Sequence, residues 1–184
     1  MIDKMKRLAS ILLFLCVVSC HQKVMVDPIT NNASMQQDIE KTWVRFIEAI
    51  SDNNLNKLRL VATQKIRCFS CVDNTEQESK ELQKFTETDP DWYNKLYDQK
   101  IFIPLDKFFN EDVPIIFNKD LMGKVKTGKV NYVERSIGKE SFYEIIVATI
   151  EPGEFAPLDE GVLHVFLFVK TADGYKFTGI DTIP

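Results

Sequence analysis

The segment VLHVFLFVK (162–170), followed by TADG (171–174) and YKFTGIDTI (175–183), carries the strongest structural signal in this chain. Both apolar runs are rich in β-branched and aromatic residues, and the pair Asp173-Gly174 lies between them. An Asp-Gly pair between two such runs is typical of a β-hairpin, because glycine tolerates the positive φ angles of tight turns. The C-terminal segment is therefore predicted to form two antiparallel strands.

Two similar runs, Lys129–Ser136 and Phe142–Ile150, precede this hairpin, and turn residues follow each of them. The first half of the chain has a different pattern. Met35–Ser51 is predicted to form an amphipathic helix with Ser34 as its N-cap, because its apolar residues recur on one helical face. Shorter helices are predicted between Leu55 and Leu121, with brief strands at 65–71 and 101–103. Helices first and a four-strand antiparallel meander last indicate an α+β fold.

The strand at 162–170 is apolar on both of its faces. An antiparallel sheet with one face in water normally alternates apolar and polar residues. We therefore expect the helices to cover one face and a second copy of the chain to cover the other, which makes a homodimer through the sheet. Alternation places the following residues on opposite faces: Val162, His164, Phe166 and Phe168 on one, and Leu163, Val165, Leu167 and Val169 on the other.

The N-terminus has the pattern of an export signal. Three basic residues occur within the first seven positions, and Leu8–Val18 is an apolar run too short to span a membrane. The run ends Val17-Val18-Ser19-Cys20, which resembles the bacterial lipobox. The resemblance implies cleavage before Cys20 and acylation of that cysteine, by palmitate-type chains, which together form a stable membrane anchor. The alternative is an ordinary secretory signal that happens to contain a cysteine.

These features predict residues 1–19 as a signal peptide, 20–34 as a lipidated tether and 35–184 as a single domain. His21 is not the aspartate that retains some lipoproteins at the inner membrane, so we expect anchoring in the outer membrane of the cell envelope. The net charge of the whole chain is −4, and removal of the basic signal makes the remainder more acidic. Nucleic-acid binding needs a basic surface and is therefore not expected.

The order of elements resembles the nuclear-transport-factor-2-like (cystatin-like) superfamily over residues 36–184. The resemblance depends on the opening helix around Trp43, Phe46 and Ala49, the short helix at Leu55–Val61, and the terminal hairpin ending YKFTGI (175–180). It implies a strongly bent antiparallel sheet that forms a cone with a small-molecule pocket, and frequent homodimers. It implies no single chemistry, since this fold hosts both enzymes and binding proteins. The segment from Cys68 to Pro104 is longer than in compact members.

Cys68 and Cys71 form a Cys-X-X-Cys motif, CFSC. A structural disulfide is expected for an exported chain with a pair of cysteines. A redox-active pair is the alternative, since Arg67 adds positive charge that lowers a thiol pKa. Half of a metal site is a further alternative, but zinc needs four ligands and the rest of the chain offers few. We predict neither a metal nor a cofactor.

His164 is the single histidine of the predicted domain, and it shares a strand face with Phe166 and Phe168. A histidine on an apolar face fits a core or interface position, or a general base in a pocket. Glu144 alternates with Phe142 and Ile146, and Asp181 alternates with Phe177 and Ile183. A carboxylate on an apolar face has a raised pKa that suits acid–base chemistry. His164, Glu144 and Asp181 are thus the candidate catalytic residues.

The aromatic residues leave two interpretations open, core packing or the lining of a ligand pocket. If they line a pocket, its residues are Trp43, Phe46, Tyr132, Tyr143 and Phe166. The main hypothesis is an envelope lipoprotein without catalytic activity that binds a small apolar ligand or a partner protein. The alternatives are an isomerase-, dehydratase- or hydrolase-type enzyme that uses His164 with a carboxylate, and a thiol–disulfide protein that uses Cys68 and Cys71.

Overall fold

A computed structural model describes residues 32–138, 140–154 and 156–183. Residues 31–184 form one compact unit. The predicted signal sequence, Cys20 and most of the predicted tether lie outside the described residues. Within the described part of the chain, no helix is long and apolar enough to cross a bilayer.

The chain begins with two helices, α1 (Asn32–Ser51) and α2 (Leu55–Val61). Helix α1 starts three residues earlier than predicted, so Ser34 lies inside the helix and is not its N-cap. Its buried face is the predicted one and comprises Ile39, Trp43, Phe46, Ala49 and Ile50. Asn54 is the N-cap of helix α2, and its side-chain oxygen accepts a hydrogen bond from the backbone N–H of Lys57.

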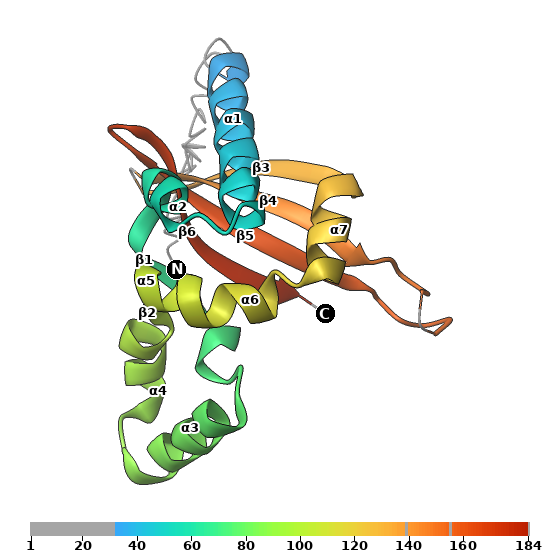
Figure 1. The fold of residues 1–184 in the computed structure, drawn as a ribbon. Helices are drawn as coiled ribbons and strands as arrows, with labels where there is room; N and C mark the ends of the chain where they lie inside the picture. The colour runs from blue at the N-terminus through green and yellow to red at the C-terminus, as the bar shows by residue number, and fades with distance from the viewer. Residues whose placement is uncertain (1–31, 139, 155, 184) are drawn as a thin grey trace, which may run out of the picture. The chain divides into compact units, whose positions relative to one another are not determined.

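Two largely helical segments follow (Figure 1). The first, which we call the arm, comprises residues 69–101, and the second, which we call the connection, comprises residues 105–129. The predicted strand at 65–71 forms earlier, as β1 (Ala62–Cys68), because the chain turns sharply between Cys68 and Cys71. The arm, the connection and the strand between them contain η2 (Ser70–Val72), α3 (Glu76–Thr88), α4 (Trp92–Lys95), the π-helical η3 (Leu96–Lys100), β2 (Phe102–Pro104), α5 (Leu105–Lys107), the π-helical η4 (Phe108–Asp112), α6 (Val113–Ile116) and α7 (Lys119–Thr127).

The last four strands form the predicted antiparallel meander. They are β3 (Val130–Ile137), β4 (Glu140–Ile150), β5 (Val162–Thr171) and β6 (Gly174–Ile183). In the described chain they belong to a six-stranded sheet with the order β2-β1-β6-β5-β4-β3. The sheet is mixed, because β1 pairs in parallel with β6 while the other neighbours are antiparallel. The α+β class is therefore confirmed, and the two brief strands predicted in the first half of the chain join the predicted meander in one sheet.

The parallel contact of β1 with β6 requires a glycine at position 179. Arg67 lies opposite Gly179 in the register of these two strands. A Cβ atom at position 179 would lie only 2.8 Å from the carbonyl oxygen of Arg67, which is too close for any side chain. Gly179 therefore allows the N-terminal half of the chain to join the C-terminal strands.

The core lies between helix α1 and one face of the sheet (Figure 1). Phe46 of α1 packs on Phe177 of β6 with ring centroids 4.4 Å apart, and Trp43 packs on Phe166 of β5 at 4.9 Å. Phe168 contacts Phe46 and Phe177 at 5.7 and 5.6 Å. The helix-facing side of the sheet is thus filled by interlocking aromatic rings.

Replacement of Phe46 by alanine should lower the free energy of unfolding by about 3–5 kcal/mol, because a fully buried ring at the centre of the cluster is lost. Val44→Ala on the same helix is the matched control, since Val44 is 53% exposed. It should change the free energy of unfolding by less than about 0.5 kcal/mol. Urea unfolding followed by circular dichroism measures both, and equal effects would contradict the assignment of the core.

Candidate functional site: a groove on the open face of the sheet

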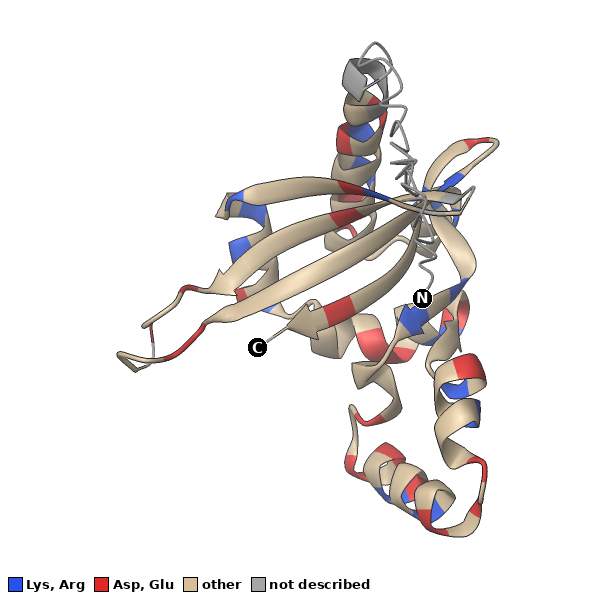
Figure 2. Cartoon of the chain, turned by 180° about the vertical axis from the view of Figure 1, so that it is seen from behind, with Lys and Arg blue, Asp and Glu red and all other residues tan. Residues whose placement is uncertain are grey.

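The face of the sheet that points away from α1 and α7 contains a groove of about 560 Å³. Figure 2 shows this face, with the strands in front of α1 and α7. The volume lies in the range of small-molecule sites, roughly 300–1,000 Å³. The groove runs across β4, β5 and β6, and the end of β1 and the adjoining arm form its rim.

The floor of the groove is apolar. Ile146 of β4 lies opposite Val165 of β5, and Leu167 lies opposite Glu144 in the same strand pair. These side chains face away from the aromatic core, because their neighbours Ile145 and Phe166 are fully buried on the helix side. The predicted apolar second face of β5 therefore forms the floor of a groove.

Two arginine–carboxylate pairs lie in the groove. The Arg67 guanidinium of β1 donates to the Asp181 carboxylate of β6, and Arg135 Nε of β3 donates to Glu144 Oε2 of β4 at 3.1 Å. All four side chains remain partly exposed. The groove is thus an apolar trough between two neutralised pairs of charged groups.

Asp181 lies on a different face from the one that strand alternation predicted. Phe177 is fully buried on the helix side, whereas Asp181 lies opposite Val165 on the open face. The register of β5 and β6 shifts between Leu167 and Phe168, as a β-bulge produces. The bulge at Thr178 changes the alternation along β6, so Phe177 and Asp181 lie on opposite faces.

The rim of the groove is formed by the Cys68–Cys71 motif and by Tyr97. Cys68 and Cys71 are joined as a disulfide, with Cα atoms 5.3 Å apart. The disulfide encloses Phe69 and Ser70, and both residues line the groove. Both cysteines are fully buried. A redox pair must be reached by its partner thiol, so the burial favours a structural disulfide that fixes the rim.

His164 lies away from both candidate carboxylates. It is opposite Val147 on the helix-facing side, whereas Glu144 and Asp181 lie on the open face. Its Nδ1 is 2.9 Å from the Thr149 hydroxyl, and burial lowers the pKa of the imidazole. The structure therefore does not bring the three predicted catalytic residues together.

The five predicted pocket residues belong to the helix side of the sheet. Trp43, Phe46 and Phe166 are parts of the aromatic core described above. Tyr143 is buried and its hydroxyl donates to Glu134 Oε2 at 3.4 Å. Burial, and then the charge of Glu134, raises the pKa of Tyr143 to about 12. Tyr132 is half-buried, and burial also raises its pKa.

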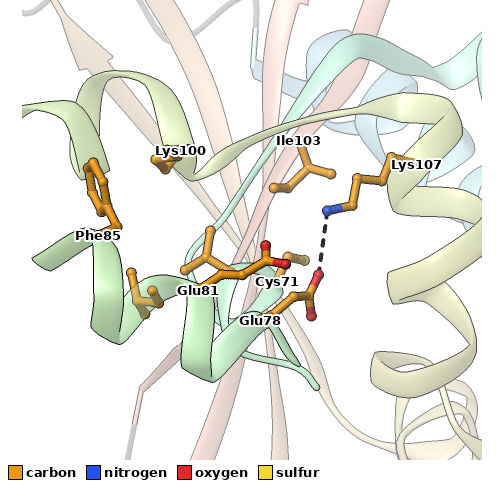
Figure 3. A pocket seen from close by; sticks show the side chains of 9 residues that line it. Cys71, Glu78, Glu81, Phe85, Lys100, Ile103 and Lys107 are labelled. Carbon is orange, nitrogen blue, oxygen red and sulfur yellow. Dashed lines mark hydrogen bonds and ion pairs between the residues drawn. The ribbon is translucent and has the colours of Figure 1, made fainter. Parts of the chain in front are cut away.

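A smaller hollow of about 160 Å³ lies between α3 and the segment that runs from the end of η3 through β2 to α5. Figure 3 shows Glu78 of α3 reaching toward Lys107 of α5, with an Nζ–Oε1 distance of 3.4 Å. This volume is below the usual range for small-molecule sites. Across the described residues, no group of His, Cys, Asp and Glu is placed to hold a metal ion.

Asp112 is a buried carboxylate that lines a second hollow of about 290 Å³, and this hollow shares Glu78 and Lys107 with the first. The residue is only 1% exposed, and its Oδ1 accepts a hydrogen bond from Asn74 Nδ2 at 2.8 Å. Its Oδ2 is buried without a hydrogen-bond partner among the described residues. Burial, together with the weaker effect of the Glu78 charge, raises the pKa of Asp112 to about 6 despite the bond from Asn74.

No protein-family model matches this chain, and no curated protein matches it. The structure therefore provides the basis for a functional assignment: an α+β domain with helices packed on a six-strand mixed sheet and a groove on its open face.

Sequence reasoning did not identify Arg67, Arg135, Phe69 or Tyr97 as groove residues. The signal for Phe69 was present, since it lies inside the Cys-X-X-Cys motif. Arg67 and Tyr97 come from segments whose pairing with distant strands has no local sequence signature. Only the tertiary fold brings them beside Asp181.

Replacement of both Cys68 and Cys71 by alanine should lower the free energy of unfolding by about 2 kcal/mol, which is the stabilisation expected for so short a loop. In the native protein the buried disulfide should resist mild reductant. Thiol labelling with a mass readout, with and without denaturant, measures this. Complete labelling of the folded protein under mild reductant would support a redox role instead.

Asp112→Asn should change how stability depends on pH. The folded state of the wild type holds a proton up to about pH 6, whereas an unfolded aspartate releases it near 3.8. The stability contributed by this proton is present at low pH and is lost as the pH rises through about 6. The free energy of unfolding of the variant, relative to that of wild type, should therefore rise by about 2 kcal/mol as the pH increases from 4.5 to 7.5.

Urea unfolding at the two pH values measures this difference. Asp98→Asn, at an exposed position of η3, is the matched control. A surface substitution of this kind should change the free energy of unfolding by less than about 0.5 kcal/mol at pH 7.5. An effect of Asp112→Asn that is equal at both pH values would show that this carboxylate titrates normally.

Proposed function

We propose that this protein is a lipid-anchored binding protein of the bacterial cell envelope, and that its ligand site is the groove on the open face of the sheet. The observation that carries the proposal is the contrast between the two faces. Aromatic rings fill the helix side, whereas the open side holds a groove of about 560 Å³ with an apolar floor and polar walls. Concave, mostly apolar sites with a few convergent polar groups are typical of ligand binding.

The anchoring part of the proposal is supported by the sequence. A basic start, a short apolar run and Val17-Val18-Ser19-Cys20 favour cleavage before Cys20 and lipidation of that residue. On this reading the segment between Cys20 and the start of α1 at Asn32 tethers the domain to the outer membrane. The apolar run is too short to be a permanent span.

We further propose that the domain belongs to the nuclear-transport-factor-2-like superfamily. The support is structural: two N-terminal helices precede the sheet, α1 packs on one face, and the long C-terminal strands run behind it as an antiparallel meander (Figure 1). The long arm between β1 and β2 is an addition to that arrangement. The fold hosts many functions, so it supports binding without identifying the ligand.

A binding role is favoured over catalysis by the environments of the candidate catalytic residues. His164 is hydrogen-bonded to Thr149 on the helix side. Glu144 and Asp181 are engaged by arginines on the open face. A general base needs a partner within hydrogen-bond reach of the same substrate, and these three groups lie on two sides of the sheet.

A second candidate function is self-association through the same face. Leu163 and Ile183 lie opposite each other at one end of the open face and are both exposed. The groove contains two arginines and two carboxylates, so the face is electrically complementary to itself, as a two-fold interface requires. In such a dimer the second copy would occupy the groove in place of a ligand.

Native mass spectrometry separates these two roles. The whole protein, purified from the envelope of its own host in a sugar-free detergent, should show a lipidated chain with an added mass of a few hundred daltons. The same spectrum should show the chain beginning at an acylated Cys20. Activation in the gas phase should release the added mass, because the ligand is held non-covalently.

The other outcomes are equally specific. A dimer without added mass would replace ligand binding by self-association through the open face. A monomer without added mass would contradict both roles for this face. Leu167→Arg is the matched variant, because a charge on the groove floor should abolish the added mass or the dimer, whichever occurs. Exposed Leu60→Arg on α2 should change neither.

A further inference from the structure

The rim of the groove carries a series of exposed aromatic rings. Phe69 is 45% exposed, Tyr97 39% and Tyr93 60%. Phe69 and Tyr97 are stacked with centroids 5.9 Å apart, and Tyr97 contacts Tyr93 at 4.9 Å. Trp92 extends the series, at 5.6 Å from Tyr93. A contiguous set of large exposed rings marks a binding site, because folded proteins rarely leave such surface in water.

These rings are held in place before any ligand arrives. Phe69 lies inside the Cys68–Cys71 disulfide loop, and Tyr97 lies in the π-helical turn η3. π-Helical turns occur frequently at functional sites. Because the rings support one another, a ligand that stacks on them loses little additional entropy of ordering.

The ion pairs in the groove provide hydrogen-bonding groups beside the rings. A guanidinium has five N–H donors and a carboxylate has about four acceptor positions. Among the described residues, one hydrogen bond joins Arg67 to Asp181 and one joins Arg135 to Glu144. Each pair therefore keeps donors and acceptors for a ligand while its net charge is zero.

This combination selects the chemistry of the ligand. Aromatic faces are electron-rich and attract C–H groups that carry partial positive charge. A pyranose ring presents such a C–H face, and its hydroxyls both donate and accept hydrogen bonds. They can therefore donate to Asp181 and accept from Arg67 at the same time. A proline-rich peptide also packs on exposed rings, but proline has no N–H to donate to the carboxylates.

We propose that the groove binds a neutral glycan, whose sugar rings stack on Tyr97 and Phe69 while their hydroxyls bond to the Arg67–Asp181 pair. This inference rests on the proposed function, and it names the ligand class. It differs from the small apolar ligand predicted from the sequence, because the charged pairs of the groove offer hydrogen-bonding groups that hydroxyls can use. The neutral pairs favour an uncharged sugar over a polyanion.

The test uses the full lipidated chain in a sugar-free detergent. The probe is a microarray of neutral and acidic oligosaccharides, followed by titration calorimetry with the neutral oligosaccharide that gives the strongest signal. Wild type should bind neutral oligosaccharides. Tyr97→Ala should weaken binding about tenfold or more, as loss of one ring does where bases stack on aromatic side chains. Tyr97→Phe should bind within about twofold of wild type, because the stacking face is kept.

Phe102→Ala is the matched control, since Phe102 is an aromatic of β2 with 36% exposure that does not line the groove. It should leave the affinity unchanged. Asp181→Asn should weaken binding of the same oligosaccharide, because the strongest acceptor next to the rings is lost. Circular dichroism of each variant checks that the fold is kept.

Failure of this inference differs from failure of the proposed function. A non-sugar mass in the native spectrum, or a proline-rich peptide whose binding is lost in Tyr97→Ala, would overturn the glycan assignment and leave the groove as a ligand site. Sugar binding that Tyr97→Ala does not change would overturn the assignment of this site. A bare mass together with an empty array would overturn both.

Discussion

The parallel contact between β1 and β6 is the constraint on which the rest of this structure depends. It joins the first half of the chain to the C-terminal meander, and it is possible because Gly179 has no side chain to collide with the Arg67 carbonyl. The contact places Arg67 beside Asp181 and brings the disulfide loop to the edge of the open face. The groove is therefore a consequence of how β1 joins the sheet.

The two faces of the sheet differ in how their side chains are packed and exposed. On the helix side, Trp43 and Phe46 pack against phenylalanines of β5 and β6 within the hydrophobic core, where removal of apolar surface from water stabilises the fold. On the other side the strands remain apolar, with Val165 buried and Ile146 and Leu167 half-buried, and the charged groups among them are neutralised in pairs. The first face stabilises the fold, and the second is the face that we propose for ligand binding.

The arm between β1 and β2 links these two roles. Its disulfide and its π-helical turn hold aromatic rings at the rim of the groove. Its base is held by Asn74, which donates to the buried carboxylate of Asp112. Burial raises the pKa of this carboxyl group to about 6.

The sequence by itself determined the α+β class, the buried face of α1, the four-strand meander and the Cys68–Cys71 pair. These features depend on local periodicity, on turn residues and on cysteine spacing. Only the tertiary structure decided that β1 joins the sheet in parallel, that a bulge turns Asp181 away from Phe177, and that His164 and the two carboxylates lie on opposite faces. The β1–β6 pairing depends on contacts between residues more than 100 positions apart, as in the Arg67–Asp181 pair. The bulge shifts the register within the β5–β6 pair, and simple strand alternation does not encode it.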